Sequence, residues 1–385
     1  SSCGPSLGFS VGTCSMYKAG VPSLWHAAPC PQLGRLISSF PSPVAGGPRP
    51  QLAVPLVVQT PAWAVGLVAL GWRLAWRARP RNRRSASVRT VTVSAAAAAK
   101  SYDLLRAATV VDPRDGSMGT ALDGLDPGGR KLIVLLPQLG DFSAEYVEQL
   151  VAVAGDLAAA GVSLRIIGIG CADAGRRFER FIGLQAGVLR VDPSAAVHRA
   201  LGLYEGPGWH APNVLPDDLR AGTEAWVNYL AMCAGIASPG TLQEILRGYL
   251  GDRSAPERLK SSSCVEAGPL RINGTRSYQV GPLAFDLWWA GEKGFQRPVE
   301  LATVRLRNLV EVLSKWSTYV PDPAYLAQRG GTFLFDGSGE ALYEFRDSGV
   351  LVYSATMSRP LSFLKDCIGD RALNPLGLGD PGPSH

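Results

Sequence analysis

The chain has 385 residues, of which 46% are hydrophobic and 18% are charged, and this composition excludes both a disordered polar chain and a polytopic membrane protein. Its seven cysteines are too few and too widely spaced for a disulfide scaffold. The net charge of +6 is unevenly distributed, because the first hundred residues hold eleven Lys and Arg and no Asp or Glu, whereas the rest holds 27 basic against 32 acidic residues. The main body of the chain is therefore mildly acidic, and we expect no nucleic-acid partner.

Residues 1–100 have the composition of a targeting presequence. They are free of acidic residues and rich in Ser, Pro, Ala and Gly, as expected of a basic, flexible segment that an import machinery reads. The absence of an initiator Met at Ser1 suggests that a signal peptide precedes this sequence.

Within this segment, Leu52–Trp72 is uncharged and long enough to span a bilayer, and six arginines occupy the next twelve positions. Pro55 and Pro61 weaken such a helix, because each removes a backbone donor. This arrangement resembles the multipart presequences of algal plastids with additional envelope membranes, which implies a chloroplast protein, either stromal or thylakoid-associated. The alternative is that residues 52–72 are retained as a membrane anchor.

From Ser101 onward the chain alternates between strand and helix patterns. In chain order these are a buried strand at Lys131–Leu136, a helix at Asp141–Ala160 with Gly161 as its C-cap, a strand at Ser163–Ile169, a helix at Asp173–Ile182, a strand at Val188–Val191 and a short helix at Ser194–Leu201. Such alternation predicts a sheet that is largely parallel in its first half.

The pattern changes toward the C-terminus. Thr332–Phe335 and Ala341–Phe345 flank a glycine turn and predict a β-hairpin, and Arg359–Ile368 predicts a final helix. Between the two halves lies a mostly helical insertion at about 205–328, in which Val299–Trp316 reads as one amphipathic helix with an apolar stripe of Ala302, Leu306, Leu309, Val310, Leu313 and Trp316. This order predicts an α/β, thioredoxin-like fold over 101–370 with a central mixed sheet, followed by a flexible tail at 371–385.

Several stretches of this region resemble the peroxiredoxin-like branch of the AhpC/TSA family, in its long cyanobacterial and plastid form. They include Leu136–Phe142 (LPQLGDF), Val162–Gly170 (VSLRIIGIG), Ala234–Thr241 (AGIASPGT), Arg247–Pro256 (RGYLGDRSAP) and Arg329–Asp336 (RGGTFLFD). The resemblance implies a thioredoxin-like fold and thiol-dependent antioxidant chemistry. It extends through the insertion.

The resemblance also implies where that chemistry takes place. Members of the family carry a nucleophilic Cys, often in a CxxC pair, at the turn between an early core strand and its helix, where the helix N-terminus favours the thiolate. In this chain the two positions correspond to Asp141 and Ala144, so both sulfurs are missing. Asp141 would serve as an N-cap, and a carboxylate forms neither a sulfenic acid nor a disulfide. We therefore expect a degenerate active site.

Cys171, just past the strand Ser163–Ile169, is the candidate catalytic thiol that remains, because neighbouring parallel strands end at one edge of the sheet. The alternative is that Cys171 is a loop cysteine without a functional role. Cys233, Cys264 and Cys367 are isolated, and Cys233 lies in an apolar run that suggests a buried position.

No cofactor or metal site is indicated. His198 and His210 lack a cluster of further ligands, there is no nucleophile-elbow serine, and Gly168–Gly170 supplies only the first part of a dinucleotide fingerprint. A close backbone approach at a strand end is the simpler explanation for these two glycines.

The insertion, together with its amphipathic helix, is rich in aromatic residues and arginine, a composition typical of interface cores. The aromatic residues are Trp209, Trp226, Tyr229, Tyr249, Phe285, Trp288, Trp289, Phe295 and Trp316. They form either a docking surface for a protein complex or the insertion's own core.

Two functions follow from the sequence. The first is a non-catalytic binding or structural subunit associated with a thylakoid or photosystem complex, with membrane contact through residues 52–72 if these are retained. The second is a thiol-dependent antioxidant oxidoreductase that uses Cys171.

Overall fold

The computed structural model describes residues 95–140, 142–249, 264–266, 277–279 and 298–376, and its main feature is a seven-stranded mixed sheet. The strand order is β2-β1-β5-β4-β3-β8-β9. The strands are β1 (Thr109–Val111), β2 (Met118–Thr120), β3 (Arg130–Gln138), β4 (Val162–Ile169), β5 (Leu189–Asp192), β8 (Gly331–Phe335) and β9 (Ala341–Arg346). The predicted α/β, thioredoxin-like fold is confirmed.

The three central strands are parallel, as the alternation of strands and helices predicts. Val134 pairs with Ile166, and Ile166 pairs with Leu189. All three side chains are fully buried, because a parallel strand covered on both faces has no face for solvent. β1 and β2, which the sequence did not predict, extend one edge in antiparallel orientation.

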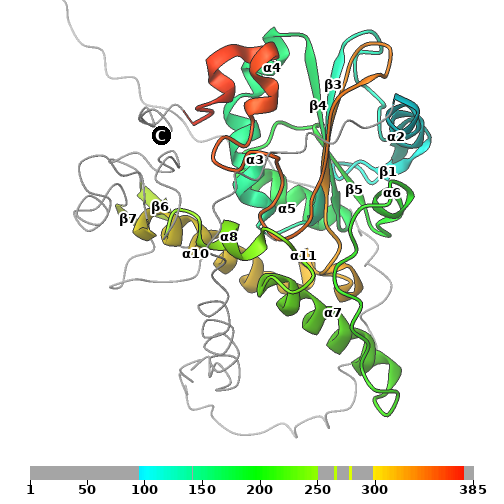
Figure 1. Ribbon diagram of the computed structural model, residues 1–385, viewed down its shortest axis with the longest axis vertical. Coiled ribbons are helices and arrows are strands. Elements are labelled where there is room, and N and C mark those ends of the chain that lie inside the picture. The colour runs from blue at the N-terminus through cyan, green and yellow to red at the C-terminus, as the bar shows by residue number, and fades with distance from the viewer. Residues whose placement is uncertain (1–94, 141, 250–263, 267–276, 280–297, 377–385) are drawn as a thin grey trace, which may run out of the picture. The chain divides into compact units, whose positions relative to one another are not determined.

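Helices cover both faces of the sheet (Figure 1). α2 (Ala95–Ala107) and α6 (Ala196–Ala200) lie on one face, and α3 (Ser143–Ala152), α4 (Ala154–Ala159) and α5 (Ala172–Ile182) lie on the other. Each face has its own hydrophobic core, one around Leu105, Ile133 and Phe335 and the other around Val147 and Phe178. The predicted single helix 141–160 is thus two helices, because the backbone at Val153 leaves helical geometry.

The C-terminal hairpin forms as predicted, with β8 antiparallel to both β3 and β9. Its turn is held by Asp336, whose Oδ1 accepts from the backbone amides of Ser338 and Glu340. The predicted continuous helix at Arg359–Ile368 is wrong: a 3₁₀ turn at Ser362–Leu364 leads into the short helix α12 (Lys365–Ile368).

The described part of the insertion is mostly helical. Its elements are α7 (Asp217–Cys233), α8 (Thr241–Leu246), the strand pair β6 (Cys264–Glu266) and β7 (Ser277–Gln279), α10 (Pro298–Ser314), α11 (Trp316–Tyr319) and a 3₁₀ turn at Pro323–Tyr325. Among the helices in this portion of the chain, none is long and apolar enough to cross a membrane. Residues 1–94 of the predicted targeting segment, including 52–72, lie outside the described residues, as does most of the predicted tail. The last six residues of that segment, 95–100, belong to α2.

α10 is turned relative to the sequence prediction. Val310 of the predicted stripe is buried and Trp316 is partly buried, yet Leu306, Leu309 and Leu313 are 39%, 49% and 57% exposed. The buried side of α10 also carries Arg305 and Asn308 beside Val304. Polar partners on α3 compensate for burial of this polar face, which hydrophobic periodicity alone does not reveal.

Two ion pairs attach α10 to α3. Arg305 Nε lies 2.6 Å from Oε1 of Glu145, which is fully buried in the first turn of α3, and a second pair joins Arg307 to Glu148. Arg305 also donates through Nη1 to the carbonyl oxygen of Ile245 at the end of α8, at 2.6 Å. The insertion is therefore anchored to the helix that follows β3.

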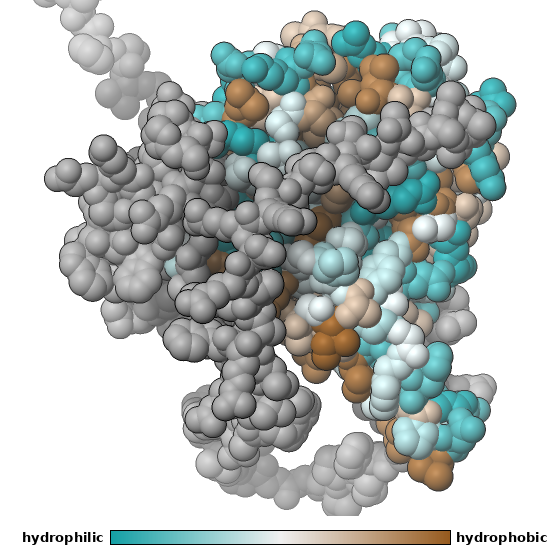
Figure 2. Space-filling model, in the orientation of Figure 1, coloured by the Kyte–Doolittle hydropathy of each residue, from teal (hydrophilic) through white to brown (hydrophobic). Residues whose placement is uncertain are grey.

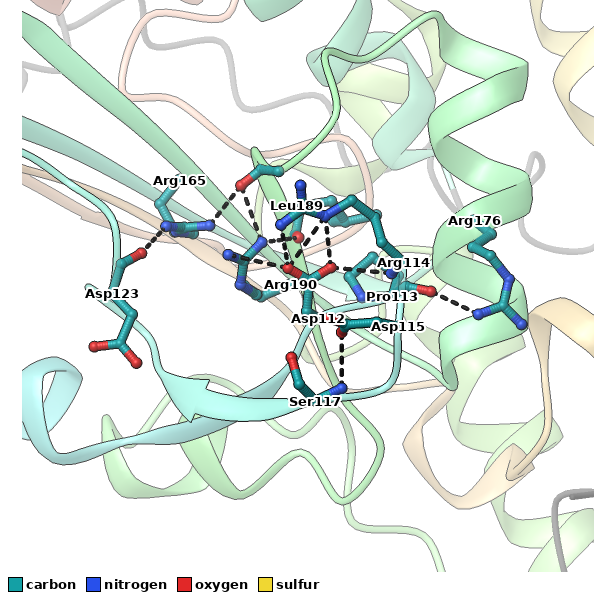
Figure 3. A network of polar contacts seen from close by, with 11 residues as sticks. Asp112, Pro113, Arg114, Asp115, Ser117, Asp123, Arg165, Arg176, Leu189 and Arg190 are labelled. Atoms are coloured by element: carbon teal, nitrogen blue, oxygen red, sulfur yellow. Dashed lines mark hydrogen bonds and ion pairs between the residues drawn. The ribbon is translucent and has the colours of Figure 1, made fainter. Parts of the chain in front are cut away.

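A second polar network fixes the opposite edge of the sheet (Figure 3). Asp112 accepts from Nε of Arg114 at 2.9 Å and pairs with Arg190, while the buried Arg165 donates to the Gly187 carbonyl at 2.7 Å. The hydrogen bonds from Arg114 lower the pKa of Asp112 to about 2, although burial opposes this shift. The network holds the loop after β1 against β4 and β5.

Replacing Glu145 with Gln tests the ion pair between α3 and α10. Removing one charge leaves Arg305 buried without its ionised partner, so we expect the free energy of unfolding to fall by roughly 3 kcal/mol. The measurement is urea denaturation. In the control Asp103→Asn, which breaks an exposed pair with Arg106, the expected loss is below about 0.5 kcal/mol. Equal effects of the two substitutions would contradict this account.

Candidate functional site

The turn between β3 and α3 lies at the carboxyl edge of the parallel strands, where the family resemblance places the reacting group. Leu139 joins this turn to the end of β4, since its amide donates to the Ile169 carbonyl at 2.9 Å. α3 begins two residues later than predicted and its N-cap residue is Phe142, so the prediction of an N-cap at Asp141 is wrong. Asp141 itself lies outside the described residues. Ala144 is 2% exposed and its methyl group belongs to the core.

Tyr319 of α11 covers this turn. Gly140 has a φ of +89°, and a Cβ built on it would lie 2.9 Å from Cδ1 of Tyr319 and 3.0 Å from Cγ2 of Val312. Only glycine therefore fits, for reasons of both backbone conformation and space. The Tyr319 ring is fully buried.

Two partly buried charged side chains hold Tyr319 in place. Its hydroxyl donates to Glu311 Oε1 at 2.8 Å, and Glu311 Oε2 accepts from Arg177 Nη2 of α5 at 2.9 Å. Burial and the neighbouring carboxylate raise the pKa of Tyr319 above its ordinary value, which keeps it a neutral donor. No sequence pattern predicts these contacts, because the three residues come from three separate helices.

Cys171 lies at the same edge, as predicted, and is the N-cap residue of α5. Its side chain is partly buried, and Sγ lies 3.9 Å from the carbonyl oxygen of Thr318 in α11. α11 therefore contacts both the Gly140 turn and the thiol.

The remaining candidates do not gather at this edge. Cys233 packs at the margin of the core, and Cys367 accepts a contact from Arg130 at 3.6 Å. Cys171 and Cys367 are free thiols. His210 is exposed beside Glu224. Within the described residues no group of His, Cys, Asp and Glu could hold a metal ion.

His198 lies in the interior of the fold. It is fully buried, and its Nε2 lies 2.8 Å from the Leu136 carbonyl of β3. Burial lowers the pKa of His198 to about 4. Gly168 is also explained, because a Cβ there would lie 2.4 Å from Cδ2 of Leu139. The close neighbour is therefore a side chain and not the backbone that the sequence suggested.

A small recess opens beside the N-terminus of α3, on the side toward the loop after β9. Its lining combines an apolar wall with three polar side chains, Ser143, Arg329 and Asp347. Burial raises the pKa of Asp347 well above its ordinary value, and the Arg329 guanidinium only partly opposes this effect. Sequence reasoning missed Asp347 entirely, since a single Asp after a strand carries no pattern.

The described aromatic residues of the insertion are partly packed and partly exposed. Trp226 of α7 stacks on Trp316 of α11 with ring centroids 5.1 Å apart and makes an edge contact with Tyr229. Trp226 and Trp209 nevertheless remain 39% and 40% exposed. Phe285, Trp288, Trp289 and Phe295 lie outside the described residues.

Comparison with known proteins gives one finding. A family model described as AhpC/TSA antioxidant enzyme matches residues 149–349, just over half of the chain. The matched stretch begins within α3, after the Gly140–Ala144 turn, and runs through the insertion to the end of the hairpin. No curated protein matches the chain.

Substituting Gly140 with Ala tests whether Tyr319 covers the turn. The new methyl group collides with the ring and the backbone is strained, so we expect a loss of roughly 2 kcal/mol or more in the free energy of unfolding. The matched control is Gly155→Ala in α4, where a Cβ meets open space, and where we expect no loss. A Gly140→Ala protein as stable as the control would show that the ring does not cover the turn.

The lowered pKa of His198 predicts that the free energy of unfolding depends on pH. Its folded pKa of about 4 lies below the ordinary value of 6.5, so the unfolded chain binds more protons between these values and stability falls as the pH drops from about 6.5 to 4. The full difference is about 3 kcal/mol, at about 1.4 kcal/mol per pH unit. In His198→Gln this component of the pH profile of unfolding should disappear. A profile identical to that of the unsubstituted protein would refute the assignment.

Proposed function

Because the chain belongs to the AhpC/TSA antioxidant enzyme family, we propose that it is a peroxiredoxin-like protein that acts by binding and not by turnover, as a structural or binding subunit of a thylakoid complex in the chloroplast. The observation that carries this proposal is the strand-to-helix turn at residues 140–144, which has no sulfur. A thioredoxin-like fold is thus combined with a turn that lacks its nucleophile.

The chemistry of the turn supports the loss of activity. Peroxide reduction by this family begins when a thiolate attacks one peroxide oxygen, giving a sulfenic acid while the other oxygen leaves as water or alcohol. Neither a carboxylate nor a methyl group can take this step. Tyr319 is packed against Gly140, and the first turn of α3 carries the buried carboxylate of Glu145, an unfavourable neighbour for a thiolate.

The surface of the insertion supports a role in binding. α10 exposes the stripe formed by Leu306, Leu309 and Leu313, and α7 exposes Trp226 and Leu230. Figure 2 shows hydrophobic side chains at the surface over α7, at the lower right of the view. Exposed apolar residues grouped along helices are a common feature of protein interaction sites.

The location of the protein in the chloroplast rests on the first hundred residues. Their lack of acidic residues and the apolar stretch at 52–72 with its arginine flank are the supporting observations. A thylakoid complex is the partner that would explain both the plastid-targeting segment and the apolar docking surface of α10.

The alternative function is a thiol-dependent oxidoreductase that uses Cys171. One observation favours it: the thiol is only partly buried and lies at the N-cap of α5, on the same sheet edge as the vacant turn. Against it, Thr318 and the packed Tyr319 occupy the adjacent space.

A peroxide assay separates the two functions. We expect the purified protein to consume hydrogen peroxide, with dithiothreitol as reductant, no faster than a protein-free control. The variant Cys171→Ser should behave identically. The enzymatic function would be favoured over the binding function if the protein turned over peroxide, if Cys171→Ser abolished this turnover and if the matched variant Cys233→Ser retained it.

Introducing negative charge at the exposed leucines of α10 tests whether this helix forms the docking surface. In the double variant Leu309→Glu and Leu313→Glu, we expect co-purification with thylakoid membrane complexes to fall at least tenfold, because two carboxylates would be desolvated in the interface. The matched control is Leu342→Glu, an exposed leucine on β9 outside the insertion. Unchanged recovery of the double variant would remove α10 from the interface. Mapping the N-terminus of the same preparation shows whether residues 52–72 are retained.

A further inference from the structure

The outward side of α10 carries leucines with the spacing of a coiled-coil seam. Leu306, Leu309 and Leu313 follow one another at intervals of three and four residues, and each is more than a third exposed. Ala302, four residues before Leu306, continues the pattern and is also exposed. A narrow stripe with this spacing is the surface along which one helix packs lengthwise on another. The occupant that fits the stripe is therefore a helix.

The outward side of α7 carries a second stripe of the same kind. Leu219, Trp226 and Leu230 lie seven and four residues apart, and each is more than a third exposed. Trp226 stacks on Trp316, which lies just beyond the end of α10, with ring centroids 5.1 Å apart. The two stripes meet at this stack. Their six large residues, three from each helix, together form what we call the apolar face.

The charges of the two helices are compensated within the chain. The structure describes three charged side chains of α10, and they form the pairs Arg305–Glu145, Arg307–Glu148 and Glu311–Arg177. On α7, Asp217 pairs with Arg220, and Glu224 accepts a hydrogen bond from the backbone amide of Ala211.

This compensation favours a second copy of the chain as the occupant. A twofold axis brings each residue near its counterpart in the other copy, so uncompensated charges on the face would repel one another. A strongly charged partner, in contrast, needs free counter-charges to pair with. The described charges of α7 and α10 are already paired inside their own chain, which suits an apolar and self-complementary contact.

The area of the apolar face is sufficient for such a contact. With a surface of roughly 200 Å² for a large apolar side chain, the exposed fractions of its six members leave roughly 550 Å² uncovered on one copy. Two copies placed face to face would cover about 1,100 Å², and about 1,000 Å² is enough for a specific interface. Monomeric proteins seldom expose a larger apolar patch without a partner for it.

We propose that a second copy of this chain covers the apolar face, with the α7 and α10 stripes of the two copies packed against each other around a twofold axis. Such an interface needs only one self-complementary patch, which each copy supplies. The pairing requires neither a thiol nor a thylakoid partner. It occupies the α10 leucines assigned above to thylakoid docking, so the dimer is the form of the protein away from that complex.

Sedimentation of the purified full-length protein tests the pairing. Over a series of concentrations we expect a reversible change from the mass of one chain to twice that mass. A protein that sediments as a single chain at every concentration would refute the pairing and leave the apolar face to a different protein.

Variants on both helices locate the contact. The double variant Leu309→Glu and Leu313→Glu on α10, and Leu230→Glu on α7, should each raise the dissociation constant of the dimer at least tenfold, because a carboxylate would lose its water in the contact. The matched control Leu342→Glu should leave the dissociation constant unchanged. All these variants retain residues 1–100, so any association through 52–72 is common to them. A dissociation constant that either helix variant leaves unchanged would overturn the pairing.

Failure of this pairing is distinguishable from failure of the proposed function. A double variant that becomes monomeric and is still recovered with thylakoid complexes would keep the dimer and remove α10 from thylakoid docking. A double variant that is lost from thylakoid complexes and still dimerises like the unsubstituted protein would refute the dimer and keep the docking function.

Discussion

The buried pair between Glu145 and Arg305 links the family fold to the insertion, and the state of the carboxyl edge depends on it. Glu145 lies in the first turn of α3, the helix that follows β3, and Arg305 lies in α10. α10 continues into α11, whose Tyr319 closes over Gly140 and whose Thr318 carbonyl faces Cys171. A buried charge requires its counter-charge, so the helix that bears Arg305 cannot leave without a large energetic cost. The insertion is in this way an integral part of the site.

The same pair also changes the electrostatics at the N-terminus of α3. In enzymes of this family that end of the helix stabilises a thiolate. Here the first turn holds a buried carboxylate whose charge is balanced from outside the helix by Arg305.

The strands of the sheet could be predicted because local signals were strong. Continuous apolar runs such as Lys131–Leu136 mark buried parallel strands, and the turn at Asp336 marks the hairpin. β1 and β2 were missed because three-residue strands carry no periodicity. In the site, the sequence located the sulfur-free turn and Cys171. It could not reveal Tyr319, Glu311, Arg177 or Asp347, whose roles arise from contacts between segments far apart in the chain. The orientation of α10 was mispredicted for the same reason, since charged partners on α3 outweigh the apolar stripe.

The outward leucines of α10 have a practical consequence for work with this protein. They contribute little to the fold, because the helix is held from its inner side by Arg305 and Val304. Water disfavours them, so high concentrations of sulfate salts should drive the isolated chain into soluble clusters or precipitate before the fold itself is affected. Polar replacements along this one strip should raise solubility while leaving the melting curve nearly unchanged, and so provide a well-behaved form of the domain for spectroscopy.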